Sequence, residues 1–117
     1  MIGKPIPSGS SSGITISKSE TVVGTYLGKT LYAKVYTATT LPNNDTLVVA
    51  SGFDYYPVFI IGIAYNKQDR KITRTLPFAA GGTNDIRLDC QGDLRIITFT
   101  DWSTYDAEIT LFYTKTA

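Results

Sequence analysis

The sequence predicts an all-β domain that folds as an antiparallel, jelly-roll-like β-sandwich of seven or eight short strands. Short runs in which apolar and polar residues alternate are separated by turn residues, as in sandwiches and barrels. Aromatic residues make up 12% of the chain, and they suit half-buried strands. No segment keeps a helical period, and 117 residues suffice for one core.

The first 13 residues, MIGKPIPSGSSSG, are rich in Pro, Gly and Ser. This composition predicts a flexible tether, with the sandwich domain at residues 14–117, and it is typical of both native tethers and added linkers. The tether lacks the apolar stretch of a signal peptide, so export by that route is not expected.

The first predicted hairpin joins residues 22–27 to residues 30–37 through Gly28 and Lys29. We expect a positive φ at the turn glycine. Alternation divides the second strand into two faces, one with Leu31, Ala33 and Val35, the other with Tyr32, Lys34 and Tyr36.

A turn at residues 41–45 precedes a strand at residues 47–50. Residues 57–66 are apolar on both faces, which predicts a central strand that is covered on both sides. Within this strand, Gly62 predicts a bulge or a close approach of the backbone.

The second half of the chain begins with a weak segment at residues 72–78 and continues with a hairpin of residues 86–90 and 94–99. Cys90, on this hairpin, is expected to be buried and inert. The final strand, residues 106–115, places four residues on its core face: Ala107, Ile109, Leu111 and Tyr113.

The composition argues against several functions. With no histidine and one cysteine, the chain cannot form an intrachain disulfide, a Ser-His-Asp triad or a Cys-His pair. The net charge of +1 does not suggest nucleic-acid binding, and no apolar run is long enough to span a membrane as a helix. No phosphate-binding loop or metal motif occurs. We therefore expect no enzyme activity, no cofactor and no metal.

One catalytic alternative is a glycosidase that uses Asp101, Asp106 and Glu108 beside Trp102 and Tyr105. Asp106 and Glu108 lie at the start of a strand, where solvated charges are ordinary. We favour that interpretation.

Two loops carry aromatic residues beside acids, which together can stack on a sugar ring and bind its hydroxyl groups. The candidate ligand-binding residues are Asp54, Tyr55, Tyr56, Asp101, Trp102 and Tyr105. The alternative is that their rings cap the ends of the sandwich or pack between subunits.

Phe112 alternates away from the core face of the last strand, so it should be covered by something else. One interpretation is an oligomer interface, to which we also assign Tyr32 and Tyr36. The other is burial beneath the N-terminal arm or a loop.

The run ETVVGTYLGKTLYAKVY at residues 20–36 resembles a phrase of tailed-bacteriophage tail-fibre proteins, V-G-T-W-I-D-G-K-x-[IL]-Y-x-K. Residues 41–44 resemble the L-P-N-N turn of that family, and residues 109–116 resemble its closing strand, V-T-L-x-Y-T-K. The sequence departs from the pattern at Tyr26, where Trp is usual, by one residue missing at Leu27-Gly28, and at Ser51, where His is usual.

The resemblance implies a receptor-binding C-terminal head domain of a phage appendage, which would be a homotrimer and would bind host-surface saccharide. It also implies contacts with other virion proteins, a place on the particle surface, and synthesis in the host cytoplasm. A rival hypothesis is a structural decoration or adaptor of the virion, such as a head fibre or tail adaptor, with no sugar ligand. A carbohydrate-binding module attached to a cellular enzyme is a third.

Overall fold

The computed structural model describes residues 14–117, so the tether expected at residues 1–13 lies outside the described residues. Eight strands form, together with one short 3-10 turn at Gly82–Asn84. The strands are β1 (Thr21–Tyr26), β2 (Lys29–Ala38), β3 (Thr46–Ala50), β4 (Tyr56–Asn66), β5 (Thr73–Leu76), β6 (Ile86–Cys90), β7 (Leu94–Thr98) and β8 (Tyr105–Thr114). The described chain is therefore an all-β domain, as the alternating pattern predicts.

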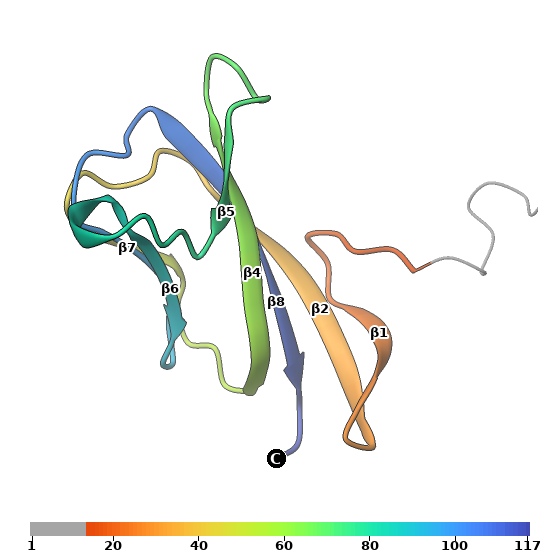
Figure 1. Ribbon diagram of the computed structural model, residues 1–117. Helices are drawn as coiled ribbons and strands as arrows, with labels where there is room; N and C mark the ends of the chain where they lie inside the picture. The colour runs from red at the N-terminus through yellow and green to blue at the C-terminus, as the bar shows by residue number, and fades with distance from the viewer. Residues whose placement is uncertain (1–13) are drawn as a thin grey trace, which may run out of the picture.

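The strands form two antiparallel sheets, one with the order β1-β2-β8-β4-β5 and one with the order β3-β7-β6. Figure 1 shows β6 and β7 on one side of β4 and β8. The chain passes between the sheets after β2, β3, β5 and β7, so the two antiparallel sheets form an all-β sandwich. The hairpins β4–β5 and β6–β7 each stay within one sheet, because their two strands pair directly with each other.

The β1–β2 hairpin turns at Leu27 and Gly28, one residue earlier than the sequence predicts. Both residues have positive φ, 50° and 79° respectively. Two successive residues of this kind give the turn the twist that joins two antiparallel strands. The positive φ expected at the turn glycine is confirmed.

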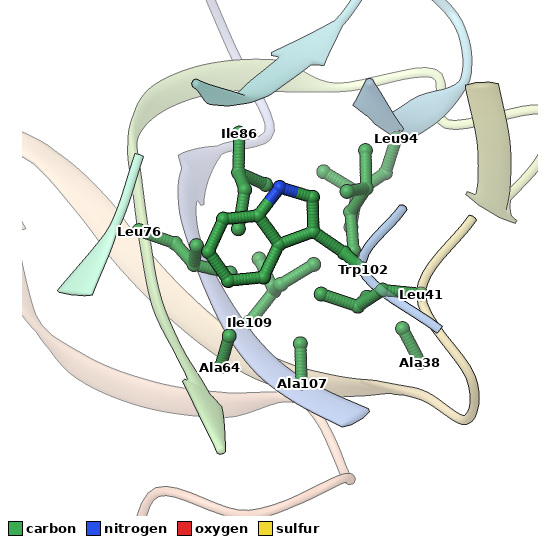
Figure 2. Close-up of a cluster of buried hydrophobic side chains, with 10 residues drawn as sticks. Ala38, Leu41, Ala64, Leu76, Ile86, Leu94, Trp102, Ala107 and Ile109 are labelled. Carbon is green, nitrogen blue, oxygen red and sulfur yellow. The ribbon is translucent and has the colours of Figure 1, made fainter. Parts of the chain in front are cut away.

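The core lies between the two sheets and is centred on β8. The predicted core face of this strand is confirmed, because Ala107, Ile109, Leu111 and Tyr113 are all buried. Figure 2 shows Ile109 and Ala107 below a cluster that also contains Leu94. Cys90 is half-buried at the margin of this cluster, and burial raises the pKa of its thiol.

β4 lies between β8 and β5, but the prediction that both of its faces are covered is wrong for the described chain. Its inner face packs in the core, whereas Phe59, Ile61 and Ile63 on the outer face are 45%, 50% and 39% exposed. The close approach predicted at Gly62 does occur, since a Cβ at this position would lie 2.7 Å from the carbonyl oxygen of Glu108.

Within residues 14–117, no helix is long and apolar enough to cross a membrane.

Candidate functional site

A pocket of about 380 Å³ opens on the inner face of the five-stranded sheet, beneath the connection from β3 to β4. Glu20, Lys34, Tyr36, Tyr113 and residues 50–55 line it. These residues come from the segment before β1, from β2, from the end of β3 with the connection that follows it, and from β8. The pocket therefore depends on four parts of the chain that are distant in sequence.

Backbone hydrogen bonds hold both margins of the pocket in place. The N–H of Val35 donates to the carbonyl of Ser17 at 2.8 Å, which holds the segment before β1 against β2 and brings Glu20 to the pocket. On the other margin, the N–H of Phe53 donates to the carbonyl of Gly92 at 2.7 Å, and the N–H of Gly52 donates to the carboxylate of Asp93 at 3.2 Å. The β6–β7 turn thus fixes the β3–β4 connection.

The wall of the pocket is a stack of aromatic rings centred on Tyr113, which is 2% exposed. Its ring is stacked between those of Tyr32 and Tyr55, each 5.7 Å away between centroids. The ring of Phe53 meets the Tyr113 ring edge-on at 5.1 Å. Tyr55 is 43% exposed, so the stack presents part of one aromatic ring to solvent, beside the ammonium of Lys115, which lies 5.1 Å from the ring centre.

A polar network lies against the stack. The hydroxyl of Tyr113 and the ammonium of Lys115 both donate to Glu20, the ammonium at 2.8 Å. The hydrogen bond from Lys115, followed by that from Tyr113, lowers the pKa of Glu20. The bond to Glu20 raises the pKa of Lys115, while burial and then the bond to Glu20 raise the pKa of Tyr113. The ammonium of Lys115 also lies 4.5 Å from the centre of the Tyr32 ring.

The Glu20 network predicts a loss of stability in acid. A carboxyl whose folded pKa is lowered contributes stability above its ordinary pKa of 4.5, and this contribution is lost as the pH falls through the folded pKa. We expect the free energy of unfolding of Glu20→Gln to depend less steeply on pH than that of the unsubstituted chain. Urea titrations between about pH 3 and pH 7 measure this slope. If the free energy of unfolding depended on pH equally steeply in both proteins, Glu20 would not be the source of the acid sensitivity.

Two charged residues of the pocket remain available to a ligand. Within the part of the chain that the structure describes, neither Lys34 nor Asp54 takes part in an ion pair. The ammonium of Lys34 lies 5.2 Å from the centre of the Tyr36 ring. The pocket can therefore offer an aromatic face, a carboxylate and an ammonium group to one small polar ligand.

The structure separates the first group of candidate ligand residues. Asp54 and Tyr55 line the pocket. Tyr56, the first residue of β4, is 49% exposed but lies outside the pocket lining.

The second group does not form a site. Trp102 is buried in the core cluster, where Figure 2 shows its indole ring among Leu76, Ile86 and Leu94. Tyr105 packs edge-on against Trp102 at 5.1 Å. These rings close the sandwich, which was the alternative stated for them.

The adjacent Asp101 closes a turn, because its carboxylate accepts the N–H of Ser103 at 2.9 Å. Hydrogen bonds from Ser103 lower the pKa of Asp101. We therefore place neither Asp101 nor its aromatic neighbours in the site.

The three candidate interface residues lie on opposite faces of the five-stranded sheet. Tyr32 pairs with Tyr113 in the β2–β8 register, and Tyr36 lines the pocket, so both belong to the inner face. Phe112 lies on the outer face, half-buried against the ring of Phe59 at 4.4 Å. Tyr36 thus lines the pocket, and Tyr32 supports it by stacking on Tyr113.

The carboxylates considered for glycosidase chemistry have other partners. Asp106 accepts the N–H of Thr40 at 2.6 Å and lies 3.7 Å from the ammonium of Lys67. Glu108 lies 4.0 Å from the guanidinium of Arg70. No cluster of three or more potential metal ligands occurs within residues 14–117.

Several residues that line the site were not identified from sequence as ligand-binding, among them Glu20, Lys34, Tyr36, Phe53 and Tyr113. Alternation identifies Tyr113 only as a core residue. Glu20 is 93 residues away from Tyr113 in the chain, and no local spacing links them. Asp54 and Tyr55, which follow Phe53 in the chain, were the one local signal that pointed to this pocket.

Comparison of the chain with models of protein families, with curated proteins and with solved structures finds no match.

Proposed function

We propose that this chain is an appendage domain of a phage virion that binds host-surface saccharide through the pocket beneath the β3–β4 connection. The observation that carries the proposal is the exposed ring of Tyr55, held by its stack on Tyr113 beside the carboxylate of Asp54. An aromatic face binds the C–H face of a sugar, and adjacent charged groups bind its hydroxyls. The resemblance of residues 20–36 and 109–116 to tail-fibre proteins supports the virion part of the proposal.

The proposed function includes self-association, as a homotrimer on the particle surface. Light scattering coupled to size exclusion tests this part, because three copies have three times the 12.8 kDa mass of one chain.

The saccharide part is tested with an array of bacterial surface polysaccharides and their component sugars. We expect the unsubstituted chain to bind at least one of them and Tyr55→Ala to bind it about tenfold more weakly, because one stacked ring contributes about 1 kcal/mol beyond the buried area. The matched control is Tyr56→Ala, which removes the adjacent, equally exposed ring from outside the pocket. Equal losses in the two variants would count against the pocket.

A second candidate function is a structural decoration or adaptor of the virion that binds no sugar. The observation that favours it is the exposed apolar row on β4, because such a surface is typical of protein contacts. A chain that self-associates but binds nothing on the array would support this function over saccharide recognition.

A further inference from the structure

We infer that the outer face of the five-stranded sheet, the face opposite β3, β6 and β7, is an interface between copies of this chain. Its centre is on β4 and β8. This inference deepens the self-association in the proposed function and rests on that part alone, since the saccharide pocket lies on the inner face.

The outer face carries an apolar row that residues 14–117 leave open. Phe59, Ile61 and Ile63 alternate along β4, so their side chains point to the same side. Their exposed fractions are between 39% and 50%. The ring of Phe112 on β8 extends the row, with its centroid 4.4 Å from that of Phe59. Soluble domains rarely leave an apolar surface of this kind without a partner.

The strand register makes the centre of this face uncharged. Ile61 pairs with Thr110, which pairs with Val35 on β2. Phe59 pairs with Phe112, which pairs with Ala33. A face without charges at its centre is the composition of a protein interface, and it offers few hydrogen bonds to a sugar.

The size of the face suits association of two folded chains. At about 3.3 Å per residue and about 4.8 Å between strands, the five strands give a flat face of roughly 650 Å². A stable interface buries about 800 Å² on each partner, and the relief of the side chains increases the flat figure. Sheet faces also pack well on one another, with interdigitated side chains.

Charges at the margin favour a second copy over a partner of one charge sign. Ile63 pairs with Glu108, whose carboxylate lies 4.0 Å from the guanidinium of Arg70. Arg70 also covers the ring of Tyr65, 3.7 Å from its centre. Both signs therefore occur side by side at one end of the row, where Glu108 and Arg70 already pair within the chain, so this margin does not select a partner of one charge sign.

The test compares Ile61→Glu with Val48→Glu by light scattering over a range of concentrations. The two positions are 50% and 49% exposed, but Val48 lies on β3 in the other sheet. We expect the unsubstituted chain to have the mass of three copies, as in the proposed function. Ile61→Glu should raise the dissociation constant about 100-fold or more, because it places an unpaired carboxylate in the interface. Val48→Glu should leave the constant unchanged.

A second variant, Ile61→Thr, covers the case in which Ile61→Glu does not fold. Thr keeps the β-branched shape that suits a strand, and we expect a dissociation constant raised about tenfold with an unchanged circular dichroism spectrum.

A full-length chain that is monomeric at about 100 µM would overturn the inference. If deletion of residues 1–13 then produced an oligomer, the occupant of the face in the full-length chain would be residues 1–13 and not a second copy. An oligomer with the same stability in all variants would also overturn it, because another surface would then hold the copies together. Binding of the folded variants to the saccharide array reports on the pocket separately, so failure of the interface and failure of saccharide recognition are distinguishable.

Discussion

Tyr113→Ala is expected to lower the free energy of unfolding by about 3–5 kcal/mol, the usual effect of removing a buried aromatic ring. Tyr113 is 2% exposed, and its ring contacts those of Tyr32, Tyr55 and Phe53. The substitution removes all three contacts and leaves Glu20 without its hydroxyl donor. Because folded domains have a net stability of about 5–15 kcal/mol, this is a large part of the total.

The matched control is Tyr113→Phe, which keeps the stack and removes only the hydroxyl group. We expect it to lose about 1.5 kcal/mol, the lower end of the range for a hydrogen bond to a charged group, because the side chain of Glu20 is 34% exposed. Urea unfolding followed by circular dichroism measures both variants. The saccharide array should show lost binding for Tyr113→Ala, because Tyr55 then has no ring to hold it, and retained binding for Tyr113→Phe. Equal effects of the two variants would show that the hydroxyl network, and not the ring stack, forms the pocket.

Ile109→Ala is expected to destabilise the fold by about 2–5 kcal/mol. Ile109 is fully buried in β8, between Tyr36 on β2 and Gly62 on β4. Since Gly62 has no side chain, truncation of Ile109 leaves a cavity that this neighbour cannot fill. A methyl group added at Gly62 would lie 2.7 Å from the carbonyl oxygen of Glu108, so Gly62→Ala should not restore the stability.

The control for this prediction is Ile72→Ala, the same truncation at a position that is 43% exposed. A surface truncation typically changes stability by less than about 0.5 kcal/mol. Denaturant midpoints at constant m-value compare the two variants directly. If Ile109→Ala were as stable as Ile72→Ala, the prediction that Ile109 is a central residue of the core would be wrong.

The strands and their core faces could be predicted from the sequence because they depend on local pattern. Alternation along residues 106–115 identifies Ile109 and Leu111 as core residues, and both are fully buried. The hairpin at residues 86–99 was likewise predicted by two apolar runs around a Gly-containing turn. A period-two pattern indicates on which side of a strand each residue lies, but it does not indicate which other strands lie beside it.

The candidate site was predicted only in part, because local pattern does not indicate which distant residues come together. Asp54 and Tyr55 could be identified locally, because an acid beside aromatic residues is visible in a few letters of sequence. Trp102 has a similar local context, yet the return of the chain between the sheets buries it in the core.

By itself, the sequence determined the fold class, the turns and the alternation of most strands, since these follow from interactions between residues close in the chain. Only the tertiary structure decided that Glu20 meets Tyr113, because strand order and register bring together residues that are 93 positions apart. It also decided that the row of Phe59, Ile61 and Ile63 is open. The apolar residues on both faces of β4 indicate that both faces are suited to burial. The packing of the two sheets determines which of these faces is buried within the chain.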